Sequence, residues 1–228
     1  MNSEENVEVI QVKICGITST EDALAAAQCG AAALGFIFYP PSPRYVKPFD
    51  AKKIISALPY TLVKVGVFVN DEPENIKKIV DSCALDMIQL HGDESPEYCR
   101  QFPVSMMIKA VELKNNDDID RALTYPIAAL LVDNRHAGLY GGTGKLSNWE
   151  LASRLKNKKS LILSGGLNTE NVAEALKTVT PDALDINSGV EVSPGKKDHK
   201  KLARIFATIR AFDTKHENFQ SIFKKRDT

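Results

Sequence analysis

The stretch Leu161-Ile162-Leu163-Ser164-Gly165-Gly166-Leu167-Asn168 passes from a short apolar run, through two glycines, to a residue that commonly starts helices. An apolar run of this length that is bounded by glycine is typical of a buried strand. A glycine has no Cβ, so the backbone N–H groups beside it can approach an anion closely, above all where a helix follows. We therefore expect a strand, an anion-binding loop and a helix, in that order.

The same succession occurs at two other places. The apolar run that ends at Asp133 is followed by Gly141-Gly142-Thr143-Gly144, and the run 183–186 is followed by Ser188-Gly189. Glycine turns also occur where no ligand binds. Three such turns after the last three strands, however, match the phosphate-binding loops of a (β/α)₈ barrel, whose active site lies at the C-terminal ends of its strands. The pattern predicts a small phosphorylated substrate.

Eight apolar runs alternate with amphipathic segments along the chain. The expected strands are Val9–Ile14, Ala33–Phe38, Val63–Val69, Asp86–Leu90, Met106–Val111, Ala128–Val132, Leu161–Leu163 and Ala183–Ile186. The clearest helical segments are 23–29, 74–83, 168–177 and 201–211. Helix starts are expected near Ser19 or Thr20, near Asp71, near Ser95, and near Asn168 or Thr169. This alternation predicts a parallel sheet, and eight repeats favour closure over an open Rossmann sheet.

The fold prediction is therefore an α/β chain with a single (β/α)₈ TIM barrel. We expect an N-terminal tail at 1–8, the barrel as catalytic domain at 9–211, and a polar extension at 212–228 that is helical or disordered. The sequence predicts no role for that extension.

Composition limits the class of partner. Lys plus Arg number 29 and Asp plus Glu number 29, so no large net field draws the chain to nucleic acid or to a membrane surface. No apolar stretch reaches the ~18 residues of a membrane span, and the acidic start 1–5 is unlike a basic leader. We expect a cytoplasmic protein, either monomer or homodimer. The cysteines show no CxxC pairing and are expected to be reduced: Cys15, Cys29, Cys83 and Cys99.

A set of short motifs, in order, resembles the phosphoribosylanthranilate isomerase family of tryptophan biosynthesis. The motifs are Val12-Lys13-Ile14-Cys15-Gly16-Ile17-Thr18, Gly35-Phe36-Ile37-Phe38, Ser42-Pro43-Arg44-Tyr45-Val46, Val65-Gly66-Val67-Phe68-Val69, Gln89-Leu90-His91-Gly92, Leu131-Val132-Asp133, Trp149, Leu163-Ser164-Gly165-Gly166-Leu167 and Asp185-Ile186-Asn187-Ser188-Gly189-Val190-Glu191. The resemblance spans about residues 9–211, and it is specific as a set because other sugar-phosphate barrels lack the Lys-Ile-Cys-Gly start. Asn187 departs from the family's more usual serine, with an effect that the sequence does not predict.

The resemblance implies an Amadori rearrangement of N-(5-phosphoribosyl)anthranilate to 1-(2-carboxyphenylamino)-1-deoxyribulose 5-phosphate. One proton goes to the ring oxygen and another leaves C2, which implies Cys15 as general base, Asp133 as general acid and neither metal nor other cofactor. The pKa of the thiol would then have to fall below about 8.5, and the pKa of Asp133 would have to rise above about 3.9. A thiolate beside the aspartate would couple the two titrations.

The resemblance also implies the groups that hold the substrate. Arg44, in a proline-restricted loop, would bind the anthranilate carboxylate through its planar fork, whereas a solvated surface arginine is the commoner alternative. Gln89 and His91 end the fourth strand and are expected near the substrate, with a purely structural histidine as an equal alternative. The phosphate would be bound by Gly142, Gly144, Gly165, Gly166, Ser188 and Gly189.

Two other functions stay open from the sequence. A different sugar-phosphate barrel, such as an epimerase or a histidine-pathway isomerase, would share the glycine loops, but Cys15 together with Arg44 argues against it. A non-catalytic phosphate-binding barrel that serves as a partner subunit is disfavoured by the presence of both Cys15 and Asp133. The lysine clusters are expected to form solvated faces: Lys156, Lys158, Lys159, Lys196, Lys197, Lys200 and Lys201.

Overall fold

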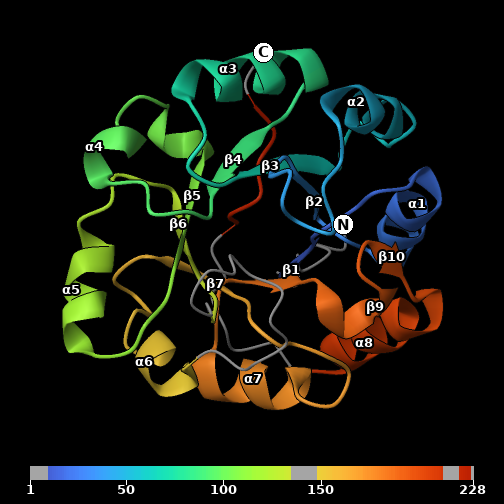
Figure 1. Cartoon of the computed structure of the whole chain (residues 1–228). Coiled ribbons are helices and arrows are strands. Elements are labelled where there is room, and N and C mark those ends of the chain that lie inside the picture. The colour runs from blue at the N-terminus through green and yellow to red at the C-terminus, as the bar shows by residue number, and fades with distance from the viewer. Residues whose placement is uncertain (1–9, 135–147, 213–220, 227–228) are drawn as a thin grey trace, which may run out of the picture.

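Eight parallel strands close into a barrel in the computed structural model, which describes residues 10–134, 148–212 and 221–226 (Figure 1). The strands are β1 (Gln11–Ile14), β2 (Ala33–Ile37), β3 (Val63–Phe68), β4 (Met87–Leu90), β5 (Met107–Val111), β6 (Ala129–Val132), β7 (Ser160–Leu163) and β8 (Ala183–Ile186). β1 pairs with β2 on one side and with β8 on the other, so the sheet has no edge. The predicted barrel is confirmed, and the open Rossmann sheet is excluded.

Helices follow the strands and surround the barrel (Figure 1). They are α1 (Thr20–Cys29), α2 (Pro48–Ser56), α3 (Pro73–Cys83), α4 (Pro96–Cys99), α5 (Asn116–Leu123), α6 (Trp149–Ser153), α7 (Val172–Val179) and α8 (His199–Ala211), with 3₁₀ turns η1 (Val104–Met106) and η2 (Ser188–Val190) and a hairpin of β9 (Glu191–Ser193) and β10 (Lys196–Lys197). Ser19 and Ser95 cap α1 and α4, as the sequence predicts. α7 begins later than expected, at Val172, because residues 168–171 form a separate turn. In this turn the side-chain oxygen of Asn168 accepts a hydrogen bond from the N–H of Asn171.

Side chains of the strands alternate between two cores. On β1, Val12 and Ile14 belong to the larger core between barrel and helices, so Lys13 and, just beyond the strand, Cys15 face the barrel interior. A smaller apolar core fills that interior towards the ends where the strands begin. Towards the C-terminal ends of the strands, buried polar side chains such as Lys13, Gln89 and Asp185 share the interior with a small apolar cluster of Cys15, Ile37 and Val67.

The C-terminal segment, residues 221–226, has neither helix nor strand and runs from the centre of the barrel to α3 (Figure 1). Ile222 and Phe223 are buried in the interior core, where the strands begin. Oε1 of Gln11 accepts hydrogen bonds from the N–H groups of Ile222 and Phe223 at 2.7 and 2.9 Å. Small residues at the starts of the strands share this core: Ala33, Ala129 and Ala183. The segment therefore fills the N-terminal mouth of the barrel.

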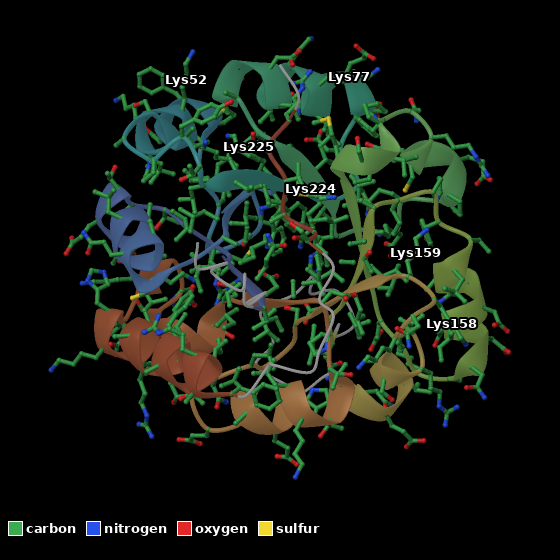
Figure 2. All side chains as sticks on the ribbon, turned by 180° about the vertical axis from the view of Figure 1, so that it is seen from behind. Lys52, Lys77, Lys158, Lys159, Lys224 and Lys225 are labelled. Carbon is green, nitrogen blue, oxygen red and sulfur yellow. The ribbon has the colours of Figure 1, made fainter. Side chains whose placement is uncertain are left out.

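Charged contacts fix the far end of the same segment. Lys225 Nζ lies 2.8 Å from an Asp86 carboxylate oxygen, and Arg226 Nη1 lies 3.0 Å from Asp81 of α3. Figure 2 shows Lys224 and Lys225 nearer the barrel axis than Lys52, Lys77 and Lys158, which lie at the rim among the helices.

The division of the chain into tail, barrel and extension stays a prediction, because residues 1–9 and 213–220 lie outside the described part. α8 ends at Ala211, where the sequence sets the end of the barrel. Within the described ranges, no helix has both the length and the apolar composition that crossing a membrane requires.

Candidate active site

The chemically reactive residues gather at the C-terminal mouth of the barrel. Cys15 follows β1, His91 follows β4 and Asp133 follows β6 directly. Gly165 and Ser188 come just after β7 and β8. Because the strands are parallel and closed, these ends surround one opening, which is the usual place of catalysis in a (β/α)₈ barrel.

Cys15 is buried beside a lysine. Lys13 lies two residues earlier on the same inward face, and its Nζ donates to Asp185 Oδ1 of β8 at 2.8 Å. Gly35 of β2 makes room for both groups: a Cβ built there would lie 2.7 Å from Cys15 Sγ and 3.0 Å from Lys13 Nζ. Any larger residue at Gly35 would therefore displace the thiol or the lysine.

Burial and the neighbouring charges shift the pKa of Cys15 in opposite directions. Burial raises the pKa of the thiol, and Lys13 and Lys197 lower it while Asp185 raises it; the net direction is upward. The family resemblance requires a lowered pKa for the Cys15 thiol, and the direction in the structure is the opposite. Desolvation of a fully buried thiolate raises this pKa by more than the two lysines lower it. Burial also opposes the charge of Lys13, yet Asp185 and Cys15 together raise its pKa.

The Asp133 carboxyl group contacts the ring of His91, and Gln89 contacts the other side of that ring. His91 Nε2 is 3.2 Å from Asp133 Oδ2, an ion-pair distance without the alignment of a hydrogen bond, so Nε2 has no hydrogen-bond partner within the described chain. On the other side of the ring, Gln89 Nε2 lies 2.9 Å from Nδ1. Asp133 Oδ1 accepts from the N–H of Asn134. His91 thus contacts the predicted acid, and Gln89, fully buried on β4, contacts His91.

Arg44 is buried against a carboxylate, so the solvated alternative is excluded. Its Nε and Nη2 donate to the two oxygens of Glu191 at 2.9 and 2.7 Å, which leaves the outer edge of the guanidinium for a second anion. Lys197 Nζ donates to Glu191 Oε1 at 3.0 Å and to Asn187 Oδ1 at 3.0 Å. The prediction of a solvated Lys197 is wrong, because its side chain points into this buried cluster while Lys196 faces solvent.

The glycine loops after β7 and β8 are in contact. A Cβ on Gly189 would lie 1.9 Å from the Leu167 carbonyl oxygen, so only glycine permits this approach. Gly165 and Gly166 have φ of 85° and 68°, and their N–H groups donate to no acceptor within the described residues. Predicted phosphate ligands Gly142 and Gly144 lie outside the described residues. The described loops thus present unpaired backbone donors at the mouth.

A family model described as N-(5'-phosphoribosyl)anthranilate (PRA) isomerase matches residues 12–208. The chain belongs to this family. It is 51% identical, over 202 residues, to the N-(5'-phosphoribosyl)anthranilate isomerase of Syntrophus aciditrophicus, a match that covers 89% of this chain and 88% of that relative. The family and the class of enzyme, an aldose–ketose isomerase of tryptophan biosynthesis, are confirmed.

Solved structures agree with this assignment. The phosphoribosyl anthranilate isomerase of Thermotoga maritima superposes with a TM-score of 0.82 at 42% identity, covering 89% of this chain and 99% of that one. A second structure is a family member in complex with reduced 1-(o-carboxyphenylamino)-1-deoxyribulose 5-phosphate; its TM-score is 0.79 at 42% identity, with the same coverage. The roles of individual residues in this chain stay predictions.

Sequence reasoning overlooked four charged residues of the site. Lys13 and Asp185 stand inside apolar strand runs, and Glu191 and Lys197 belong to a hairpin that the sequence does not predict. A charged residue within a buried strand is itself a signal, because it is costly unless it is paired. Lys13 and Asp185 lie directly opposite in the β1–β8 register, which makes them such a pair.

Proposed function

We propose that the chain converts N-(5'-phosphoribosyl)anthranilate to 1-(2-carboxyphenylamino)-1-deoxyribulose 5-phosphate, with Cys15 as general base and Asp133 as general acid. The supporting observation is that both side chains are buried at the same barrel mouth, next to an arginine edge and to glycine loops with unpaired N–H groups. A solved structure of a family member holds a reduced form of the proposed product, which supports this substrate class.

In the proposed mechanism, Asp133 gives its proton to the furanose ring oxygen. The bond between that oxygen and C1 breaks, and the nitrogen lone pair forms the imine. The Cys15 thiolate then removes the proton on C2; the electrons of that bond form the C1–C2 double bond of the enolamine, and the nitrogen takes back its electron pair. The enolamine becomes the ketone when C1 takes up a proton and the C2 hydroxyl group loses one. One acid and one base suffice, and no electrons enter or leave the molecule.

The two charged groups of the substrate would bind on different sides of the C-terminal mouth. The outer edge of the Arg44 guanidinium would hold the anthranilate carboxylate, while Glu191 keeps the other edge fixed. The phosphate would bind backbone N–H groups of the loops that were predicted for it. These are Gly165, Gly166, Ser188 and Gly189, with Gly142 and Gly144 as further candidates.

His91 would act on the acid rather than on the substrate. Its ring is held by Gln89 at Nδ1, and Nε2 lies 3.2 Å from Oδ2 of the Asp133 carboxyl group. We expect this contact to hold the carboxyl in the orientation needed to reach the ring oxygen. Cytoplasmic location, the lack of a nucleic-acid partner and the choice between monomer and homodimer stay predictions.

The test is the loss of anthranilate-type fluorescence when the protein is added to freshly made substrate. The parent protein should turn the substrate over, and Cys15→Ala should lower kcat by about 10²- to 10⁴-fold, the usual worth of a positioned base. Cys83→Ala, which removes a buried thiol on α3, is the matched control and should keep full activity. Binding of a phosphate ester without turnover would instead indicate a non-catalytic barrel.

A further inference from the structure

We propose that Lys13 is a positioning residue for the base: its ammonium group, shared between the Asp185 carboxylate and the Cys15 sulfur, stabilises the thiolate, and Asp185 sets how strongly it does so. The inference deepens the proposed function and rests on Cys15 being the base.

Geometry places the three groups together. β1 puts Lys13 and Cys15 on the same inward face, and the β1–β8 register puts Asp185 directly opposite Lys13. Lys13 is completely buried, with Nζ 2.8 Å from Asp185 Oδ1, and its positive charge lowers the pKa of the neighbouring Cys15 thiol. An ammonium group has three N–H donors, so it can hold the carboxylate and the sulfur at once.

The missing side chain at Gly35 maintains this arrangement. Both Cys15 Sγ and Lys13 Nζ lie within 3.0 Å of the point where a Cβ would stand. The pair therefore occupies the space over one glycine, and neither group is shielded from the other by a side chain of β2. In such a dry site a charge–charge interaction is far stronger than in water.

The charged side chains on this side of the mouth are paired with one another. Within the described residues, three cations and three carboxylates surround Cys15 or its neighbours: Lys13, Arg44, Lys197, Asp185, Glu191 and Asp22, which accepts from the N–H of Lys197. Arg44 and Lys197 share Glu191, so the Lys13–Asp185 pair is the charged pair that stands next to the sulfur. Lys13 and Lys197 both act against the desolvation of a Cys15 thiolate, and Lys13 has the larger effect of the two.

Asp185 limits the effect because it competes for the same ammonium group. Its negative charge raises the pKa of Cys15, while Lys13 lowers it. Ser164 Oγ lies 3.5 Å from Asp185 Oδ2, so the carboxylate has a second, longer contact that would hold it in place if Lys13 turned towards the sulfur. Removal of the carboxylate should therefore strengthen the base, and removal of the lysine should weaken it.

The experiment titrates the thiolate directly. Its ultraviolet absorbance is followed against pH, and the same titration of a Cys15→Ala version of each background is subtracted, so that the other cysteines and the tyrosines cancel. Lys13→Met should move the midpoint upward by about one pH unit, a ~10-fold loss of thiolate at fixed pH, and Asp185→Asn should move it downward. Equal midpoints in parent and Lys13→Met would overturn the proposal.

A double variant protects the test against misfolding, because Lys13→Met alone leaves a buried carboxylate without its partner. Asp185→Asn and Lys13→Met/Asp185→Asn differ only in the lysine, and the double variant carries no unpaired charge at this position. The proposal requires a higher midpoint in the double variant. The same midpoint in both would make Lys13 a structural residue.

The pH profile of kcat/KM separates this inference from the proposed function. If Cys15 is the base, the acidic limb of the profile should shift by the same amount as the thiolate midpoint in each variant. Shifted midpoints with an unshifted profile would keep Lys13 as the group that tunes the thiol, but would remove Cys15 as the base. Unshifted midpoints with an inactive Cys15→Ala would do the reverse.

Discussion

The interior of the barrel is filled differently at its two mouths. At the C-terminal mouth, charged groups such as Lys13, Asp185 and Arg44 are buried and satisfied mainly by one another. At the N-terminal mouth, small strand residues meet Ile222 and Phe223 of the C-terminal segment, and a single amide, Gln11, satisfies the backbone that enters with them. The first arrangement costs desolvation and supplies chemistry, while the second supplies stability.

This difference makes the two ends separable by mutation. Apolar burial contributes to the free energy of unfolding in proportion to area, whereas a buried ion pair is often neutral for stability against a well-packed apolar alternative. We therefore expect substitutions at the C-terminal mouth to change kinetics and substitutions at the N-terminal mouth to change stability.

The largest effect is expected at the acid. Asp133→Asn keeps the shape of the side chain but removes its acidic proton, so kcat should fall by about 10²- to 10⁴-fold with little change in thermal unfolding. Steady-state kinetics and a melting curve measure the two quantities, and Asp120→Asn, on the exposed face of α5, is the control. A drop of less than a few-fold would remove Asp133 from the mechanism.

Phe223→Ala is the corresponding test at the other mouth. Truncation of a buried aromatic ring costs about 3–5 kcal/mol, so the urea midpoint should fall while kcat and KM stay near the parent values. Lys224→Ala, the exposed neighbour on the same segment, should leave both unchanged. If Phe223→Ala lowered kcat at temperatures where the protein is fully folded, the two mouths would be coupled and the comparison would be broken.

A smaller effect is expected from Arg44→Ala. A charged hydrogen bond to the substrate is worth about 1.5–3 kcal/mol, so KM should rise by roughly 10- to 150-fold if the bond is as strong in the ground state as in the transition state. The exposed Arg204 of α8 provides the control variant. Unchanged KM and kcat would limit Arg44 to its structural pair with Glu191.

The sequence predicts the barrel well because all eight strands are buried on both faces and therefore read as continuous apolar runs. It also predicts that Cys15 and Asp133 share a mouth, since both directly follow strands of one parallel barrel. The Lys13–Asp185 pair was not foreseen, because the closure that brings β1 beside β8 joins residues 172 positions apart. The Lys13–Asp185 contact follows from the register between β1 and β8, which the local sequence pattern does not show.

The C-terminal segment was missed for a different reason. Ile222 and Phe223 are two apolar residues before a run of Lys and Arg, too few to give any periodic signal. What fixes them is a mouth lined by alanine, and those alanines lie on strands far away in the sequence. Likewise, the burial of Lys197 depends on the carboxylate of Glu191 across a hairpin, a partner that a cluster of lysines does not reveal.

The path of residues 221–226 also decides how the enzyme can be handled. The segment leaves the barrel at Arg226 beside α3, on the face opposite the reactive groups. An affinity tag, a fluorescent label or a tether to a solid support attached beyond this point would stand away from the side where substrate enters. In that orientation, the C-terminal mouth of each immobilised molecule would face the solution. The turnover rate on a column would then be set by the catalytic reaction and not by restricted access of the substrate.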